Sequence, residues 1–244
     1  KNIFNIFIYL FWLFIVIFTA FHHELWRDEA QVWCIVRDCN LSDIINMARV
    51  EGHPLLWYLI LLPFAKLGFN VEVMQIISII SVGIGVLWLV FKSELNNVQK
   101  ILMIFSAGLL YYLPVVARNY ALIVPVLFLL AVYWKEKDKH PIFYTLLIIL
   151  LSQTHSYMLG LVGILTLFFI LNEFKKHKIA CFVLVLNLIF VFLYFKGALS
   201  ENYALATKYK QTISPWELTV FLSQVWLFDV INNIKPLIKF AIPI

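Results

Sequence analysis

The stretch "HHELWRDEAQVW", residues 22–33, gathers an Arg, an Asp and two Glu beside two Trp in a chain that is 63% apolar and 14% charged. Carboxylates can act as general bases, and the arginine guanidinium binds phosphate oxygens through two parallel hydrogen bonds. Three later segments carry further polar groups: "EGHPLLWYL" (51–59), "ARNYAL" (117–122) and "THSYMLGL" (154–161). We therefore ask which elements would position these groups, and whether they share one face.

The composition identifies an integral membrane protein. Mean hydropathy is +0.89 and aromatic residues make up 17% of the 244 residues. Windows long enough to cross a bilayer contain few charges, whereas a soluble fold would need an implausibly large core. The net charge of +5 comes mainly from lysines in short loops, so it is an orientation signal and gives no indication of nucleic-acid binding. Three cysteines provide no disulfide framework.

Hydropathy predicts an all-α fold, a polytopic transmembrane helix bundle with about eight spans. The long apolar runs are 3–21, 73–91, 101–117, 119–134, 142–157, 158–171, 179–195 and 217–234, with a shorter run at 54–69. We interpret residues 1–244 as a single transmembrane domain. The chain begins with Lys1 and stops at "KFAIPI", so we expect that a C-terminal part is missing.

Lysine positions predict the orientation of the spans. The loops 92–100, 135–140 and 172–178 are short and rich in lysine, which is typical of cytoplasmic loops. Counting crossings from these loops places residues 22–72 in one large outer loop, with 117–120 and 154–157 at outer turns. The run 54–69 then cannot be a simple crossing, and with Pro54 and Pro63 it is predicted to be a helix in the outer interface.

Helix signals occupy the rest of the outer loop. Residues 28–38 are predicted to form a short amphipathic helix with Asp28 and Glu29 in its first turn, where the helix dipole favours carboxylates. Ser42 is the expected N-cap of a second helix through Met47 and Ala48, ending near Gly52.

This arrangement resembles the GT-C superfamily of membrane glycosyltransferases, and within it the protein O-mannosyltransferase and lipid A aminoarabinose transferase type. The resemblance is carried by Asp28-Glu29 in "WRDEAQVW", by "EGHPLLWYL", by "ARNYAL" and by "THSYMLGL". It departs from the family where His53 is followed by one Pro instead of two. The resemblance implies an inverting transferase that moves a sugar from a polyprenyl-phosphate-linked donor to an acceptor hydroxyl on a lipid, glycan or protein. It also implies a multi-pass protein of the cell (inner or plasma) membrane, in contact with membrane lipids, whose active site is on the extracytoplasmic face.

The resemblance assigns Asp28 as the catalytic base, while Glu29 supports the site or contacts the acceptor. The alternative for Asp28 is a helix-start acid. Arg118 is the first candidate for binding the donor phosphate, and the alternative is an arginine that extends to lipid headgroups. Further candidates for phosphate or sugar binding are His53, His155, Tyr157, Arg27 and Lys66.

A divalent metal ion is a further option, since His and carboxylate side chains suit zinc or manganese. The residues considered for it are Asp28, Glu29 and His53, with His22, His23 and Glu24 nearby. The competing class of protein is a polytopic transporter or flippase of a lipid-linked or small polar substrate. Such proteins concentrate ionisable groups near the bilayer midplane. Here the predicted spans contain few polar side chains, namely Asp229, Asn187 and Gln153. A purely structural membrane subunit is the third interpretation.

Overall fold

The computed structural model describes the backbone of residues 2–208 and the side chains of residues 2–196. Within this part the chain is helical and forms no strand. The helices are α1 (Asn2–Phe21), α2 (Arg27–Asp38), α3 (Leu41–Val50), α4 (Leu56–Lys66), α5 (Val73–Lys92), α6 (Asn97–Ile104), η1 (Gly108–Tyr112), η2 (Asn119–Leu122), α7 (Ile123–Tyr133), η3 (Trp134–Glu136), α8 (Pro141–Ser152), η4 (Ser156–Met158), α9 (Leu159–Glu173) and α10 (Lys178–Lys208).

Five helical segments of the described chain are long and apolar enough to cross a membrane. They are Asn2–Phe21, Val73–Lys92, Asn119–Glu136, Ser156–Glu173 and Lys178–Lys196. The all-helical class is confirmed, and the fold is compatible with a helical membrane bundle. The expected run 101–117 is instead divided between α6, the π-helix η1 and a turn, and 142–157 contains only the 12-residue α8. The run 217–234, with Asp229, lies outside the described residues.

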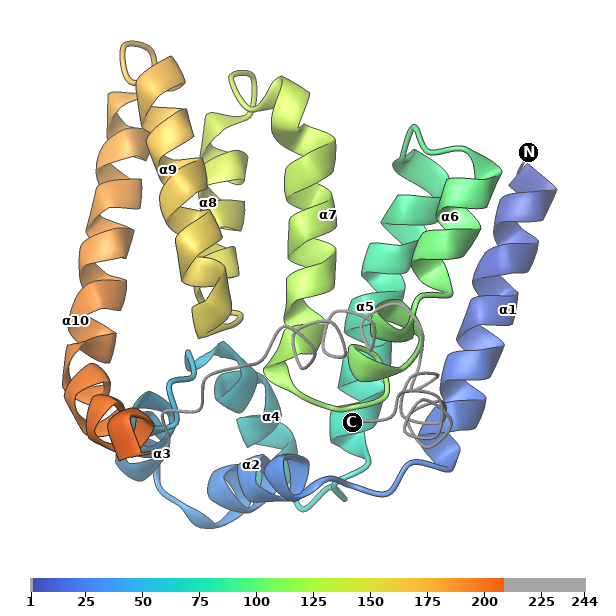
Figure 1. Ribbon diagram of the computed structural model, residues 1–244, viewed down its shortest axis with the longest axis horizontal. Coiled ribbons are helices and arrows are strands. Elements are labelled where there is room, and N and C mark those ends of the chain that lie inside the picture. The colour runs from blue at the N-terminus through green and yellow to red at the C-terminus, as the bar shows by residue number, and fades with distance from the viewer. Residues whose placement is uncertain (1, 209–244) are drawn as a thin grey trace, which may run out of the picture.

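The three lysine-rich loops lie at the same end of the bundle. In Figure 1 the connections α5 to α6, α7 to α8 and α9 to α10 are at the top, together with the start of α1, while α2, α3 and α4 lie at the bottom. Helix α4 therefore begins and ends on the side away from the lysines. Its 11 residues span about 16 Å, roughly half the thickness of a hydrocarbon core. This arrangement is consistent with the sequence prediction that the run 54–69 is not a simple crossing.

The outer segment folds into the short helices α2, α3 and α4. Helix α2 is the predicted amphipathic helix, extended by Arg27 at its start. The expected cap of α3 was wrong by two residues: Asn40 is the N-cap and accepts a hydrogen bond from the backbone N–H of Asp43 at 3.0 Å, so Ser42 lies inside the helix. Beyond α3, Gly52 adopts a φ of 74°, which ends the helix and turns the chain toward His53.

Three hydrophobic clusters hold these elements together. One joins α1, α5 and the α6 region around Trp12 and Val86, and another joins α2, α3 and α4 around Trp57. The third joins α7 to α10 around Ile148. Helix α5 also packs closely against α7, because Gly85 has no side chain to separate it from Val124 and Pro125. The start of α7, and with it Arg118, is thereby fixed next to the outer helices.

Candidate functional site

Glu29 fixes the relative position of α2 and the segment that carries Arg118. It is fully buried, and its carboxylate accepts hydrogen bonds from the backbone N–H of Trp26 at 2.8 Å and of Ala117 at 2.7 Å. Its Oε2 also lies 2.9 Å from His23 Nε2. These three contacts join residues up to 88 apart and occupy both carboxylate oxygens. Glu29 thus holds α2 against the segment before Arg118, and both of its carboxylate oxygens are already hydrogen-bonded.

Arg118 extends one guanidinium nitrogen to each of two other predicted site residues. Its Nη1 lies 2.9 Å from Asp28 Oδ2, and its Nη2 lies 3.2 Å from His53 Nε2. The Arg118 side chain is only 9% exposed, whereas that of Asp28 is 66% exposed. The guanidinium also lies 5.9 Å from the ring centroid of Tyr120. A buried cation is therefore paired with a carboxylate that remains open to solvent on its other side.

Two imidazoles lie beside this ion pair, and each carries a buried ring nitrogen without a partner. The ring centroids of His53 and His155 are 5.2 Å apart, and Tyr120 stacks on His155 at 4.7 Å. His155 Nδ1 accepts from the backbone N–H of Tyr157, which leaves the proton of the neutral ring on Nε2. By the same reasoning, His53 accepts from Arg118 through Nε2 and carries its proton on Nδ1. His53 Nδ1 and His155 Nε2 have no hydrogen-bond partner among the described residues.

The pKa values of both histidines are lowered. Burial is the main cause, and the positive charge of Arg118 contributes to both. For His155 the pKa falls to about 4, so the ring is neutral at pH 7. Neutral imidazoles beside a guanidinium supply N–H donors without adding charge. Together with Arg118 they form a buried, donor-rich cluster, which suits the oxygens of an anion such as phosphate.

Of the other predicted phosphate-binding residues, Tyr157 contacts this cluster, whereas Arg27 and Lys66 do not. Tyr157 is 77% exposed, and its ring contacts His155 from outside at 4.3 Å. Lys66 donates instead to the carbonyl oxygens of Arg37 and Cys39 at the end of α2, both at 2.9 Å. Arg27 is exposed at the first position of α2, and no hydrogen bond or ion pair among residues 2–196 joins it to Arg118. Arg27 and Lys66 therefore have no contact that would support a phosphate-binding role.

The predicted metal ligands are not arranged around a common point. The Glu29 oxygens accept hydrogen bonds, Asp28 pairs with Arg118, and His53 Nε2 faces the guanidinium. Within the described residues no group of three His, Cys, Asp or Glu side chains is placed to hold a metal ion. The observed donor set thus fits an anion better than a cation.

Several residues that support the site were not predicted. Tyr58 donates to Glu51 Oε2 at 2.6 Å, and Gln31 also bonds Glu51, which ties α2 and α4 to the turn before His53. Tyr194 of α10 donates to the carbonyl oxygen of His53 at 3.2 Å. The contacts of Gln31 and Tyr194 join residues 20 and 141 apart, so no local pattern could have indicated them.

An apolar groove of about 790 Å³ lies between α1 and α5 on the same side of the bundle. Its walls include Ile17 and Phe21 of α1 and Ile76 of α5, and its polar end includes His23 and Glu72. His23 also bonds Glu29, so the polar end of the groove is connected to the segment that holds Arg118. A groove of this kind suits a lipid chain next to the polar cluster.

Comparison with known proteins gives no relative for this chain. No protein-family model, curated protein or solved structure matches it.

Proposed function

We propose that this protein is an inverting glycosyltransferase of the GT-C type, which moves a sugar from a polyprenyl-phosphate-linked donor to an acceptor hydroxyl. The observation that carries the proposal is the contrast within one ion pair. Asp28 is two thirds exposed, while Arg118 is buried beside two imidazole N–H groups that lack partners. An accessible carboxylate next to a buried cluster of hydrogen-bond donors matches the two tasks of this reaction, which are to accept a proton and to bind a phosphate.

In the proposed reaction the acceptor oxygen attacks the anomeric carbon of the sugar. The bond from that carbon to the phosphate oxygen breaks, and polyprenyl phosphate leaves with the bonding electrons. The acceptor proton passes to a carboxylate oxygen of Asp28. Because phosphate is already a good leaving group, no second carboxylic acid is needed to protonate it. Attack from the face opposite the phosphate inverts the anomeric configuration.

In the proposed reaction, the ion pair between Arg118 and Asp28 opens when the donor binds. Before the donor binds, the guanidinium contacts Asp28 at 2.9 Å and His53 at 3.2 Å. A donor phosphate competes for the same guanidinium nitrogens, and the unpartnered N–H of His155 can donate to it. Asp28 is then released from the ion pair and is free to receive the acceptor proton. Donor binding thereby prepares the base.

The position of the cluster supports a reaction at the membrane surface. The site lies at the end of the bundle opposite the lysine-rich loops, which by the positive-inside rule is the extracytoplasmic side of the cell membrane. The groove between α1 and α5 would accept an isoprenoid chain from the lipid phase. A lipid-linked donor can therefore reach Arg118 without its tail leaving the membrane.

The test is an incubation of purified protein with a panel of polyprenyl phosphate sugars, measuring free polyprenyl phosphate and sugar-labelled acceptor together. We expect equal amounts of both products from at least one donor, and none with heat-inactivated protein. If the donor moves across vesicle membranes without being cleaved, the protein is a transporter or flippase. If it is neither cleaved nor moved, the transferase proposal is wrong.

A further inference from the structure

A second groove lies at the opposite end of the bundle, between the beginning of α8 and the beginning of α10. In Figure 1 both of these helix ends are at the top, beside the α9 to α10 connection. The groove encloses about 680 Å³. Its apolar walls include Ile142, Leu146 and Val183, and its mouth is lined by Lys175, Lys176 and Lys178. Because α10 is one of the presumed spans, the groove lies where bilayer headgroups would meet the protein.

The charge at this mouth is uniformly positive. No carboxylate lines the groove, and no ion pair among residues 2–196 takes up any of its three lysines. His177 also lines it, and its Nε2 contacts the carbonyl oxygen of Asp138 at 3.1 Å. Glu173, at the end of α9, is buried and does not line the groove. An anionic group at the mouth would therefore meet little local repulsion.

A buried hydroxyl provides an independent indication of a ligand. Thr145 of α8 lines the groove and is 4% exposed, yet its Oγ1 has no hydrogen-bond partner. A buried polar group without a partner is costly, and such groups in folded proteins usually meet water or a ligand. An ester or phosphate oxygen in the groove would accept from this hydroxyl.

We propose that this groove binds an anionic glycerophospholipid. The lipid phosphate interacts with Lys175, Lys176 and Lys178, an oxygen of the headgroup or glycerol region accepts from Thr145, and an acyl chain packs along Ile142, Leu146 and Val183. Basic pockets between spanning helices on the cytoplasmic side are a recognised mode of binding acidic headgroups. This site is independent of the proposed transferase activity and lies at the other end of the molecule.

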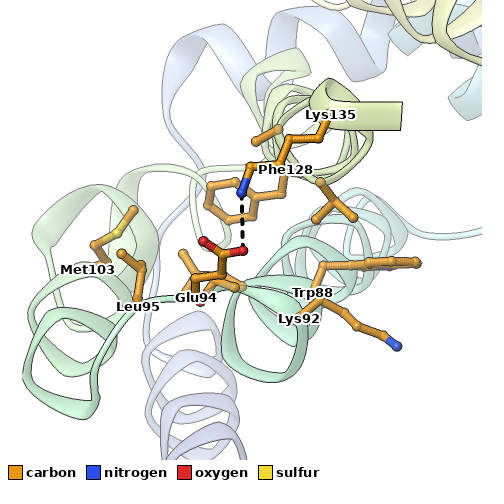
Figure 2. A pocket seen from close by; sticks show the side chains of 11 residues that line it. Trp88, Lys92, Glu94, Leu95, Met103, Phe128 and Lys135 are labelled. Atoms are coloured by element: carbon orange, nitrogen blue, oxygen red, sulfur yellow. Dashed lines mark hydrogen bonds and ion pairs between the residues drawn. The ribbon is translucent and has the colours of Figure 1, made fainter. Parts of the chain in front are cut away.

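A neighbouring pocket at the same end offers a matched control. It lies between α5, α6 and α7, encloses about 510 Å³ and contains Lys92 and Lys135. Figure 2 shows Lys135 directed at Glu94, which lies 3.3 Å away and also lines the pocket. This carboxylate offsets part of the positive charge, so we expect the pocket to discriminate less between anionic and zwitterionic lipids.

The experiment is a native mass spectrometry titration of the purified chain with phosphatidylglycerol and, separately, phosphatidylcholine. We expect phosphatidylglycerol to bind at least about 10-fold more tightly, since each lysine near an anionic headgroup contributes roughly a fivefold gain in affinity. The triple variant Lys175→Gln, Lys176→Gln, Lys178→Gln should lose this preference. The double variant Lys92→Gln, Lys135→Gln should retain most of it.

Thr145→Val tests the groove without changing its charge. The variant keeps the shape of the side chain and replaces the hydroxyl by a methyl group. The melting temperature without added lipid should therefore not fall, whereas the affinity for phosphatidylglycerol should fall a few-fold. Equal binding of the two lipids by the wild-type chain would overturn the proposal. An equal loss of the preference for phosphatidylglycerol in the double variant would also overturn it. Full competition by glycerol 3-phosphate would do the same, since it would indicate a site for free phosphate.

Discussion

Asp28 and Glu29 are adjacent in the sequence but have opposite environments. The Asp28 side chain is 66% exposed, whereas Glu29 is completely buried and accepts three hydrogen bonds. On a helix, neighbouring positions point about 100° apart, so one side chain can face solvent while the next faces the core. The pair therefore divides the work, with Asp28 available for chemistry and Glu29 holding the segment before Arg118.

Glu29→Gln should reduce the free energy of unfolding by about 1 to 3 kcal/mol. The amide NH₂ of Gln would replace one acceptor oxygen and face an N–H group, so a donor would meet a donor. Thermal unfolding in detergent measures this loss. Glu24→Gln, an exposed carboxylate outside the cluster, is the control, and as a surface change it should stay within about 0.5 kcal/mol of wild type. Equal unfolding temperatures for Glu29→Gln and wild type would contradict the positioning role.

The lowered pKa of His155 predicts a pH dependence of stability. Its pKa is about 4 in the folded chain, below the ordinary value of 6.5, so between these values the unfolded chain binds more protons. Stability should therefore fall as the pH is lowered from about 6.5 to 4, by up to roughly 3 kcal/mol. His155→Asn keeps an acceptor for the N–H of Tyr157 but cannot titrate, so its unfolding temperature should vary less with pH. Parallel profiles of the two proteins would exclude His155 as the cause.

Among the elements, α5 and α7 are in close contact at Gly85. A Cβ added there would lie 2.6 Å from Val124 Cγ1 and 3.0 Å from the backbone of Pro125. Gly85→Ala should therefore destabilise the chain by about 1 to 3 kcal/mol and reduce sugar transfer, because α7 begins five residues after Arg118. Gly83→Ala is the control on the same helix, since its nearest contact would be the Tyr9 hydroxyl at an ordinary 3.4 Å. Melting temperature and transfer rate of both variants check the prediction, and equal losses would argue against a specific α5 to α7 contact.

The sequence predicted the outer helices better than it predicted the run 101–117. Gly52 and the first-turn acids of α2 are local signals, so the positions of these helices followed from them, while the orientation indicated by the lysine loops stays a prediction. Hydropathy alone, however, does not register Gly108 and Pro114, where the chain leaves α-helical geometry for a π-helix and a turn. The structure brings Asp28, His53 and Arg118 into contact and places His155 beside them. The bonds of Glu29 to Ala117 and of Lys66 to Arg37 depend on tertiary contacts that no spacing reveals.

At the scale of the whole molecule, the site and the lysine-rich loops occupy opposite ends of the bundle. From the lysine-rich loops we predict that α4 does not cross the membrane and that Asn70, after α4, lies on the outer side. We expect a cysteine at Asn70, in a background without Cys34, Cys39 and Cys181, to react with a membrane-impermeant maleimide in intact cells. Protection until permeabilisation would place this segment in the cytoplasm and remove the basis for a surface site.

The most direct test of the proposed chemistry is the transfer rate of Asp28→Asn with a donor that the wild-type chain uses. We expect donor binding to remain close to wild type and turnover to fall about 10²- to 10⁴-fold, because the amide keeps the shape of the side chain but cannot accept the proton. Glu24→Gln, a nearby exposed carboxylate outside the cluster, should keep full activity. Turnover of Asp28→Asn within a few-fold of wild type would contradict the assignment of Asp28 as the base.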